Sequence, residues 1–151
     1  QTRIVRIFNT YGERMRPRDG RVVPALICQA LAGEPMTVFG DGTQQRSFTH
    51  VTDVVGALLK LVNEPHAIGQ VVNIGNTEEV TIRALAERVR HLSGSNSTIK
   101  LIPYDEAYES GFEDMPRRVP DLTKVKALIG YEPQNNLDDI LIQVIDYFRR
   151  K

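Results

Sequence analysis

The sequence of 151 residues contains a single cysteine, Cys28, and no tryptophan. One cysteine cannot close an internal disulfide, which is typical of a reducing compartment and favours a cytoplasmic location. No apolar run approaches the roughly 18 residues that span a bilayer. The N-terminal stretch QTRIVRIFNT enters a strand-like pattern with no signal peptide before it. We therefore expect neither a membrane protein nor a disulfide-rich secreted one.

Neither sign of charge is in excess, because Lys+Arg and Asp+Glu both number 19 and the formal net charge is zero. Proteins that coat nucleic acid depend on excess positive charge for their affinity. The sequence also shows no aromatic platform on which RNA bases could stack. We expect no nucleic-acid partner. What the chain does have is enough apolar material, 41% of its residues, to bury a core.

Several catalytic and metal-binding motifs are missing as well. There is no GxxxxGK phosphate loop and no glycine-rich dinucleotide fingerprint, and GDG at 40–42 is weak evidence alone. The three histidines are scattered and no cysteines are paired, so no metal site is expected. Tyr147 and Lys151 have the YxxxK spacing of short-chain dehydrogenases. They stand at the end of the last helix, where lysine is common because of the helix dipole. We assign no catalytic residue.

The hydrophobic pattern predicts a mixed α/β chain. The segments 4–8 and 71–74 are short apolar runs, typical of strands covered on both faces in a parallel sheet. Asp53 and Thr81 are expected to cap helices, and Gly33 and Gly130 to end them. Further strands are expected at 36–39, 47–51 and 99–102, and helices at about 22–31, 53–64, 82–92, 125–129 and 137–148.

Four arginines lie near turns and are the first candidates for chemistry: Arg14, Arg21, Arg46 and Arg118. Arginine carries a planar, permanent charge with a fork of donors that suits phosphate oxygens. Arg46 stands just before a predicted strand, after the glycine-rich turn, and Arg118 stands just before VPD. On chemistry alone two interpretations stay open, a phosphate-binding site or solvated surface arginines.

Four segments, taken together in their order and spacing, say more about function than any single arginine. They are RIFNTYG at 6–12, DGRVVP at 19–24, TVFGDGTQQRSFTHVTDV at 37–54 and RRVPDLTKVKALIGYEP at 117–133. Together they resemble the C-terminal half of extended short-chain dehydrogenases of the NAD-dependent epimerase/dehydratase family. Within it they are similar to UDP-glucuronate decarboxylases and UDP-hexose 4-epimerases. The resemblance implies a single unit over 1–151, with two late Rossmann strands (3–8 and 71–75) and a small mixed α/β substrate-binding domain. The N-terminal NAD-binding part is expected to be absent.

The resemblance also implies roles for residues that match the family. The expected cofactor contacts, near the nicotinamide end of NAD, are Phe8, Thr10, Tyr11 and, less firmly matched, Arg14. The expected substrate contacts are Asn9 for the sugar diphosphate, Arg21 and Val22 closing over the nucleotide, Thr37 and Phe39 for uracil, Arg46 with Phe48 nearby for the diphosphate, Arg118 as a second phosphate-binding arginine, and Asp121 for the ribose hydroxyls.

The family reaction implied by the resemblance is transient oxidation at C4 of the sugar by NAD, followed by epimerisation, elimination or decarboxylation. The glycine-rich NAD loop and the catalytic YxxxK pair do not occur at matching positions, so we expect the chain alone to be inactive. The acidic stretch YDEAYESGFEDMPRR leaves the outcome open between decarboxylase and epimerase. A stand-alone, non-catalytic nucleotide-binding or interaction module is the alternative. The full-length family is expected to be homodimeric.

Overall fold

The computed structural model describes residues 1–17, 19–107 and 114–151, and they form two compact units. The first unit comprises Gln1–Gly12, Ser47–Glu79 and Val119–Ile140, and the second comprises Glu13–Arg46, Val80–Arg118 and Leu141–Lys151. Three separate segments of the chain build each unit.

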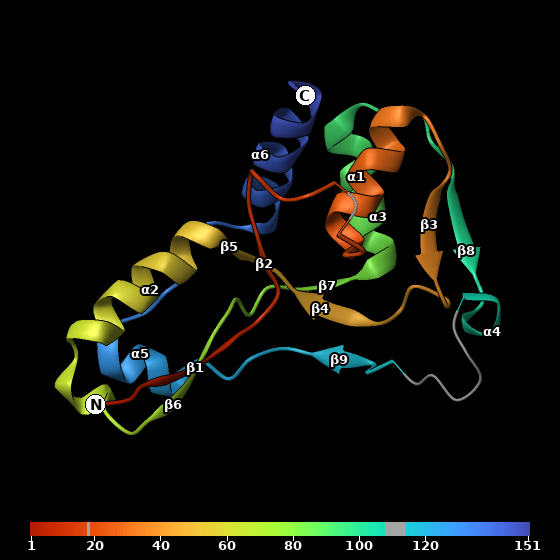
Figure 1. The fold of residues 1–151 in the computed structure, drawn as a ribbon. Helices are drawn as coiled ribbons and strands as arrows, with labels where there is room; N and C mark the ends of the chain where they lie inside the picture. Colours follow the sequence, from red (N-terminus) through yellow and green to blue (C-terminus); the bar gives the residue numbers. More distant parts are fainter. Residues whose placement is uncertain (18, 108–113) are drawn as a thin grey trace. The chain divides into compact units, whose positions relative to one another are not determined.

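The first unit is built around a pair of parallel strands. Strand β1 (Ile4–Ile7) pairs in parallel with β6 (Val71–Ile74), in the register Ile4 with Val71. The strands β2 (Thr10–Tyr11) and β5 (Thr49–His50) form a second, short parallel pair. Three helical elements complete the unit, namely α2 (Val51–Asn63), the 3-10 turn η1 (Pro65–Ala67) and α5 (Thr123–Ile129) (Figure 1). The two expected Rossmann-like strands are thus present and parallel.

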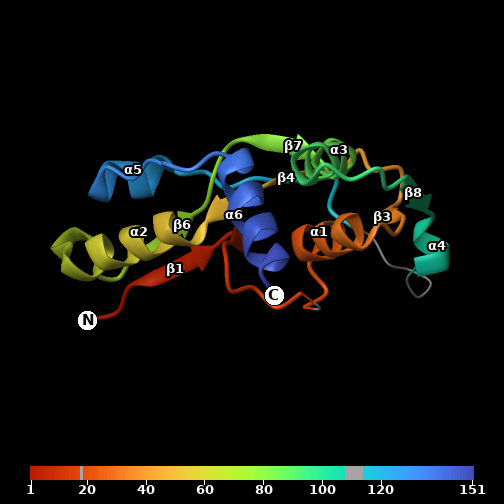
Figure 2. The same cartoon turned by 90° about the horizontal axis from the view of Figure 1, so that it is seen from above.

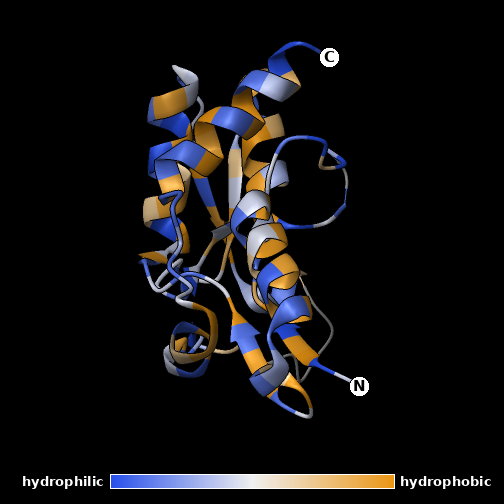
Figure 3. Cartoon of the chain, turned by 90° about the vertical axis from the view of Figure 1, so that its left-hand side faces the viewer, coloured by the Kyte–Doolittle hydropathy of each residue, from blue (hydrophilic) through white to orange (hydrophobic). Residues whose placement is uncertain are grey.

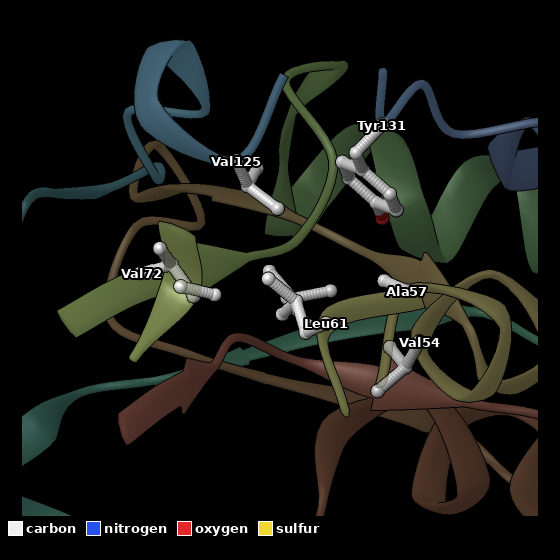
Figure 4. Close-up of a cluster of buried hydrophobic side chains, with 8 residues drawn as sticks. Val54, Ala57, Leu61, Val72, Val125 and Tyr131 are labelled. Carbon is white, nitrogen blue, oxygen red and sulfur yellow. The ribbon is translucent and has the colours of Figure 1, made fainter. Parts of the chain in front are cut away.

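The core of the first unit lies where α2, α5 and β6 meet. Figure 4 shows Leu61, Val72 and Val125 gathered in it, with the ring of Tyr131 close by. The spacing of Val54, Ala57 and Leu61 places them on one face of α2, and all are at most 4% exposed.

The second unit packs two helices against a parallel strand pair. Strand β3 (Met36–Phe39) pairs with β8 (Ile99–Ile102), and the two strands run side by side in Figures 1 and 2. Helices α1 (Val22–Ala32) and α3 (Ile82–Ser93) contact each other and β3. The fully buried side chains here include Leu26, Ile27, Met36, Leu85 and Val89.

The remaining elements of the chain are short, apart from the last helix. They are β4 (Gln45–Ser47), β7 (Glu79–Thr81), α4 (Tyr104–Ala107), β9 (Arg117–Arg118) and α6 (Leu137–Arg149). Strands β7, β4 and β9 form one sheet with β4 in the middle. The helices of the chain carry both orange and blue bands in Figure 3, as amphipathic helices do.

Most predicted elements are confirmed, and three expectations were wrong. The strand expected at 47–51 is divided, because β4 ends at Ser47 and α2 already begins at Val51. Helix α2 is capped by His50, whose side chain accepts from the N–H of Thr52, and Asp53 lies inside the first turn. Strand β1 is not covered on both faces, because Ile4 and Ile7 are each about half exposed.

Candidate functional site

Two of the predicted phosphate-binding residues are neighbours in the second unit. Strands β4 and β9 run in parallel, with Arg46 in register with Arg118. Register partners on adjacent strands project from the same face of a sheet, about 5 Å apart. Arg46 is 9% exposed, whereas Arg118 is exposed. The fold therefore brings together two cationic residues from distant parts of the sequence.

The guanidinium of Arg46 forms an ion pair with an acidic residue, Asp114, that is not among the residues predicted from the sequence. Its Nη2 forms an ion pair with Oδ1 of Asp114 at 2.6 Å, and its Nη1 donates to the carbonyl of Gln45 at 2.8 Å. The side chain of Arg46 is 11% exposed and that of Asp114 is 31% exposed. A buried cation without a partner is strongly unfavourable, so this carboxylate stabilises Arg46 in its place.

A chain of hydrogen bonds holds Asp114 from the other side. The hydroxyl of Tyr104 donates to Oδ2 of Asp114 at 3.2 Å and accepts from Nε2 of Gln44 at 3.0 Å. The same amide nitrogen donates to the carbonyl of Phe39 at 2.9 Å. The tyrosine ring lies against Gly40, where any side chain would collide with it, and the φ of +69° at Gly40 also favours glycine. The GDG turn thus has a structural role, which is to seat Tyr104.

The predicted base-binding strand β3 is tied to helix α1 at Thr37. The side chain of Gln29 accepts from the backbone N–H of Thr37 and donates to its hydroxyl, both at 2.9 Å. Phe39, the other predicted residue of this strand, is 37% exposed. Of the two residues, Phe39 is the more exposed, since Thr37 is half-buried.

Arg21 and Val22 mark the start of helix α1. Asp19 accepts from the backbone N–H of Arg21 at 3.0 Å and from its Nε at 2.6 Å, and hydrogen bonding to Arg21 lowers the pKa of Asp19 below its usual value although partial burial opposes this. Val22 is the first helical residue and is half-buried. The side chain of Arg21 is 48% exposed, whereas that of its partner Asp19 is 17% exposed.

In the first unit, the predicted cofactor residues follow the carboxyl end of β1. Ligands of open parallel sheets bind at the carboxyl ends of the strands, so the topology fits the expected dinucleotide. Thr10 donates from its hydroxyl to the carbonyl of Phe8 at 2.7 Å. Tyr11 is 4% exposed and packs edge-on against Phe48, with ring centroids 5.4 Å apart. Arg14, in the second unit, is exposed and has a φ of +66°, unusual for a residue other than glycine.

The last two predicted substrate residues, Asn9 and Asp121, also belong to the first unit. Asn9 donates from Nδ2 to the carbonyl of Ser47 at 3.1 Å. Asp121 is exposed at the rim of a hollow that Asn76, Tyr131 and Asn135 also line. Its Oδ1 accepts from the N–H of Thr123 at 2.8 Å, and hydrogen bonds from the side chain and backbone of Thr123 lower the pKa of Asp121.

The remaining chemical candidates give no second site. Tyr147 and Lys151 do contact each other, but through the ring face, with Nζ 4.8 Å from the ring centroid. Within the part of the chain that the structure describes, no group of three or more His, Cys, Asp or Glu side chains is placed to hold a metal ion. No helix among those residues is both long and apolar enough to cross a membrane.

Asp114, Tyr104 and Gln44 are the site residues that sequence reasoning missed. Asp114 and Tyr104 lie in the acidic stretch YDEAYESGFEDMP, to which the sequence assigns no binding residue. Since the pattern of charges there gives no period, only the fold could show that one of its carboxylates reaches Arg46. Residues 108–113 of the same stretch lie outside the described residues.

Comparisons with known proteins agree with the resemblance found in the sequence. Residues 1–75 match the model of the NAD dependent epimerase/dehydratase family. The whole chain is 43% identical to UDP-glucuronic acid decarboxylase 1 of Danio rerio, of which it covers 34%. It is also 38% identical, over 97% of its length, to UDP-N-acetyl-alpha-D-glucosaminuronate decarboxylase of Bacillus cytotoxicus, of which it covers 46%.

A solved structure with a similar fold is that of UDP-glucuronic acid 4-epimerase from Bacillus cereus, in complex with UDP-glucuronic acid and NAD. The TM-score is 0.85 and the sequence identity 31%, over 97% of this chain and 45% of that one. The chain thus spans between about a third and a half of the length of these relatives. The predicted fold class, a mixed α/β fold with parallel strands like the C-terminal part of an extended short-chain dehydrogenase, is confirmed.

Proposed function

Because the chain resembles NAD-dependent epimerases and dehydratases along its whole length, we propose that it is the nucleotide-sugar-binding portion of such an enzyme. The observation that carries this proposal is the register of Arg46 with Arg118 in strands β4 and β9. Two forked cations on one face of a small sheet suit the two negative charges of a nucleoside diphosphate. Each charge-assisted hydrogen bond contributes about 1.5–3 kcal/mol.

The neighbouring residues of the second unit suit the nucleotide end of the ligand. Phe39 presents a ring and the strand backbone to a uracil base, with Thr37 fixing the strand through Gln29. Arg21 and Val22, at the start of α1, close over the nucleotide. We place UDP-uronates first among the ligands, because the two decarboxylase relatives and the similar epimerase structure are all named for uronic acid derivatives of UDP-sugars.

The first unit supplies the remaining contacts of the proposal. Phe8, Thr10 and Tyr11 follow the carboxyl end of β1, where NAD is expected, and Arg14 is a further candidate. Asn9 and Phe48 contact the substrate, and Asp121 accepts from ribose hydroxyls. When bound, NAD supplies transient oxidation at C4 of the sugar. The residues of this chain bind and orient the ligands, and we assign none of them to proton transfer. For the full-length enzyme we propose a cytoplasmic homodimer.

Calorimetric titration of the chain with UDP, UDP-glucuronate, UDP-glucose and dTDP tests the proposal. We expect the UDP compounds to bind, and uridine, which lacks the diphosphate, to bind at least tenfold more weakly because two or more charge-assisted bonds are lost. Absence of heat with every nucleotide at millimolar concentration would overturn the proposal.

A turnover assay separates the proposal from the non-catalytic alternative. UDP-glucuronate and NAD are incubated with the chain, and the nucleotide products are separated by chromatography. We expect binding without turnover by this chain alone, whether the full-length protein is an enzyme or a binding module. Adding an N-terminal part of an identified relative should restore conversion only if the chain is a portion of an enzyme. Conversion of UDP-glucuronate by the chain alone would contradict the proposal that none of its residues performs proton transfer.

A further inference from the structure

The guanidinium of Arg46 is held by contacts within the second unit. Both of its terminal nitrogens have partners in the chain, Nη2 the carboxylate of Asp114 and Nη1 the carbonyl of Gln45. Only 11% of the side chain is exposed. A phosphate that binds the N–H of Nη2 now donated to Asp114 must therefore replace this carboxylate.

The position of that carboxylate is set by the fold and not by Arg46 alone. Tyr104 binds Oδ2 of Asp114, and Gln44 binds the hydroxyl of Tyr104 and the carbonyl of Phe39. Tyr104 is seated against the backbone of Gly40, which has room for the ring only because it lacks a side chain. These contacts hold an anion in front of a buried arginine.

We propose that Asp114 takes the place of the ligand's phosphate in the free protein. Its carboxylate pairs with Arg46 until a diphosphate binds and displaces it. This inference rests on the proposed function, since it takes Arg46 as a diphosphate contact. It adds a competitor within the chain that lowers affinity and selects among ligands.

The selection follows from the charges. Exchanging one carboxylate for a group with a single negative charge leaves the charge around Arg46 as it was. A diphosphate with two negative charges satisfies Arg46 and interacts with its register partner Arg118 as well. Asp114 therefore disfavours singly charged groups at Arg46 more than diphosphates, because only the latter gain enough to displace it. An uncharged ligand such as uridine does not compete with Asp114 for Arg46. The fraction of chains with Arg46 available sets the apparent affinity.

The substitution Asp114→Asn tests the proposal directly. Asparagine keeps the size of the side chain but removes its charge, so the diphosphate competes with a weaker partner. We expect the affinity for UDP and for inorganic pyrophosphate to rise roughly threefold to tenfold, as for the loss of one charge-assisted interaction, and the affinity for uridine to stay unchanged. Asp105→Asn is the matched control, since Asp105 is exposed in the neighbouring helix α4, and it should change neither affinity.

A second variant, Tyr104→Phe, tests the same proposal if Asp114→Asn does not fold. Tyr104→Phe removes only the hydroxyl that holds Oδ2 of Asp114 and leaves the ring against Gly40. It should raise the affinity for UDP in the same direction by a smaller factor, about two- to threefold. Far-ultraviolet circular dichroism verifies that each variant is folded.

The outcomes separate this inference from the proposed function. If the unsubstituted chain binds UDP and both variants bind it equally or more weakly, Asp114 positions Arg46 rather than competing for it, and the inference is overturned while the proposed function stands. If neither the unsubstituted chain nor the variants bind UDP or pyrophosphate, both fail together. Tighter binding of UDP by both variants, with uridine unaffected, supports the inference.

Discussion

Arg46 and Arg118 are register partners in the parallel strands β4 and β9. Like charges in register on adjacent strands are destabilising by themselves. Here Asp114 pairs with Arg46 at 2.6 Å and offsets part of the repulsion. Because this arrangement has a cost in stability, it accords with the proposal that the two arginines bind an anionic ligand.

Replacing Arg118 by alanine should weaken the binding of UDP about tenfold, because one charge-assisted contact to the diphosphate is lost. Arg118 is exposed, so the free energy of unfolding should change by no more than about 0.5 kcal/mol. Calorimetric titration and denaturant unfolding give the two quantities.

Arg117→Ala is the matched control for this variant. Arg117 is also exposed and precedes Arg118 in β9, but alternation along a strand points it to the opposite face, and its register partner is Gln45. A loss of UDP affinity equal to that of Arg118→Ala would show that β9 attracts the ligand by general charge and that the register has no special role.

Gly40→Ala should destabilise the chain by about 2–3 kcal/mol and also disturb the site. The φ of +69° alone costs alanine about 1 kcal/mol, and the added methyl group collides with the ring of Tyr104. Gly94→Ala is the control, since Gly94 has a similar φ of +63° with open space around it. In denaturant unfolding, Gly94→Ala should lose only the stability attributed to the positive φ. Equal losses of unfolding free energy in both variants would exclude a packing role for Gly40.

Much of the fold follows from local signals in the sequence. Gly33 and Gly130 end helices α1 and α5 in the left-handed conformation, as expected, and the periodic apolar residues of α6 are buried. The exposure of Ile4 and Ile7 could not be predicted, because an apolar run shows that a strand suits burial and not whether other strands are present to cover it.

The candidate site was predictable only in part, for a related reason. Arg46 and Arg118 were found through the family resemblance, which ties residues far apart in sequence to one ligand. The partner of Asp114 in the ion pair, Arg46, lies far away in the chain, and no periodic pattern in the acidic stretch indicates which of its carboxylates reaches that arginine. The capping of α2 by His50 was missed because an aspartate stood nearby and imidazole is a less common cap.

Thr81→Ala tests a cap that the sequence predicted and the structure confirmed. The hydroxyl of Thr81 accepts from the N–H of Ala84 at 3.1 Å at the start of helix α3. Its loss should lower the free energy of unfolding by about 1 kcal/mol, measured in urea. Thr81→Ser keeps the hydroxyl and should recover most of this loss; if it does not, the methyl group of Thr81 matters more than the cap.

Tyr131→Phe should make stability at high pH less dependent on pH. Tyr131 is 5% exposed, and its hydroxyl donates to the carbonyl of Gly75 at 2.8 Å in the core shown in Figure 4. Burial, with a smaller contribution from Asp53, raises the pKa of Tyr131 to about 12. Because the ordinary pKa is 10.0, the folded state holds this proton more tightly. The resulting stability is complete below pH 10 and is lost as the pH rises through 12.

At pH 7 the same variant should lose about 1–3 kcal/mol of unfolding free energy, because the carbonyl of Gly75 is left buried without its donor. Between pH 9 and 12 the difference between the variant and the unsubstituted chain should shrink, since the variant lacks the tyrosine proton whose loss destabilises the latter. Tyr147→Phe, at a half-buried position of α6, is the control at pH 7, where it should follow the unsubstituted chain. A constant difference across this range would mean that Tyr131 ionises with equal ease in the folded and unfolded states, against its burial.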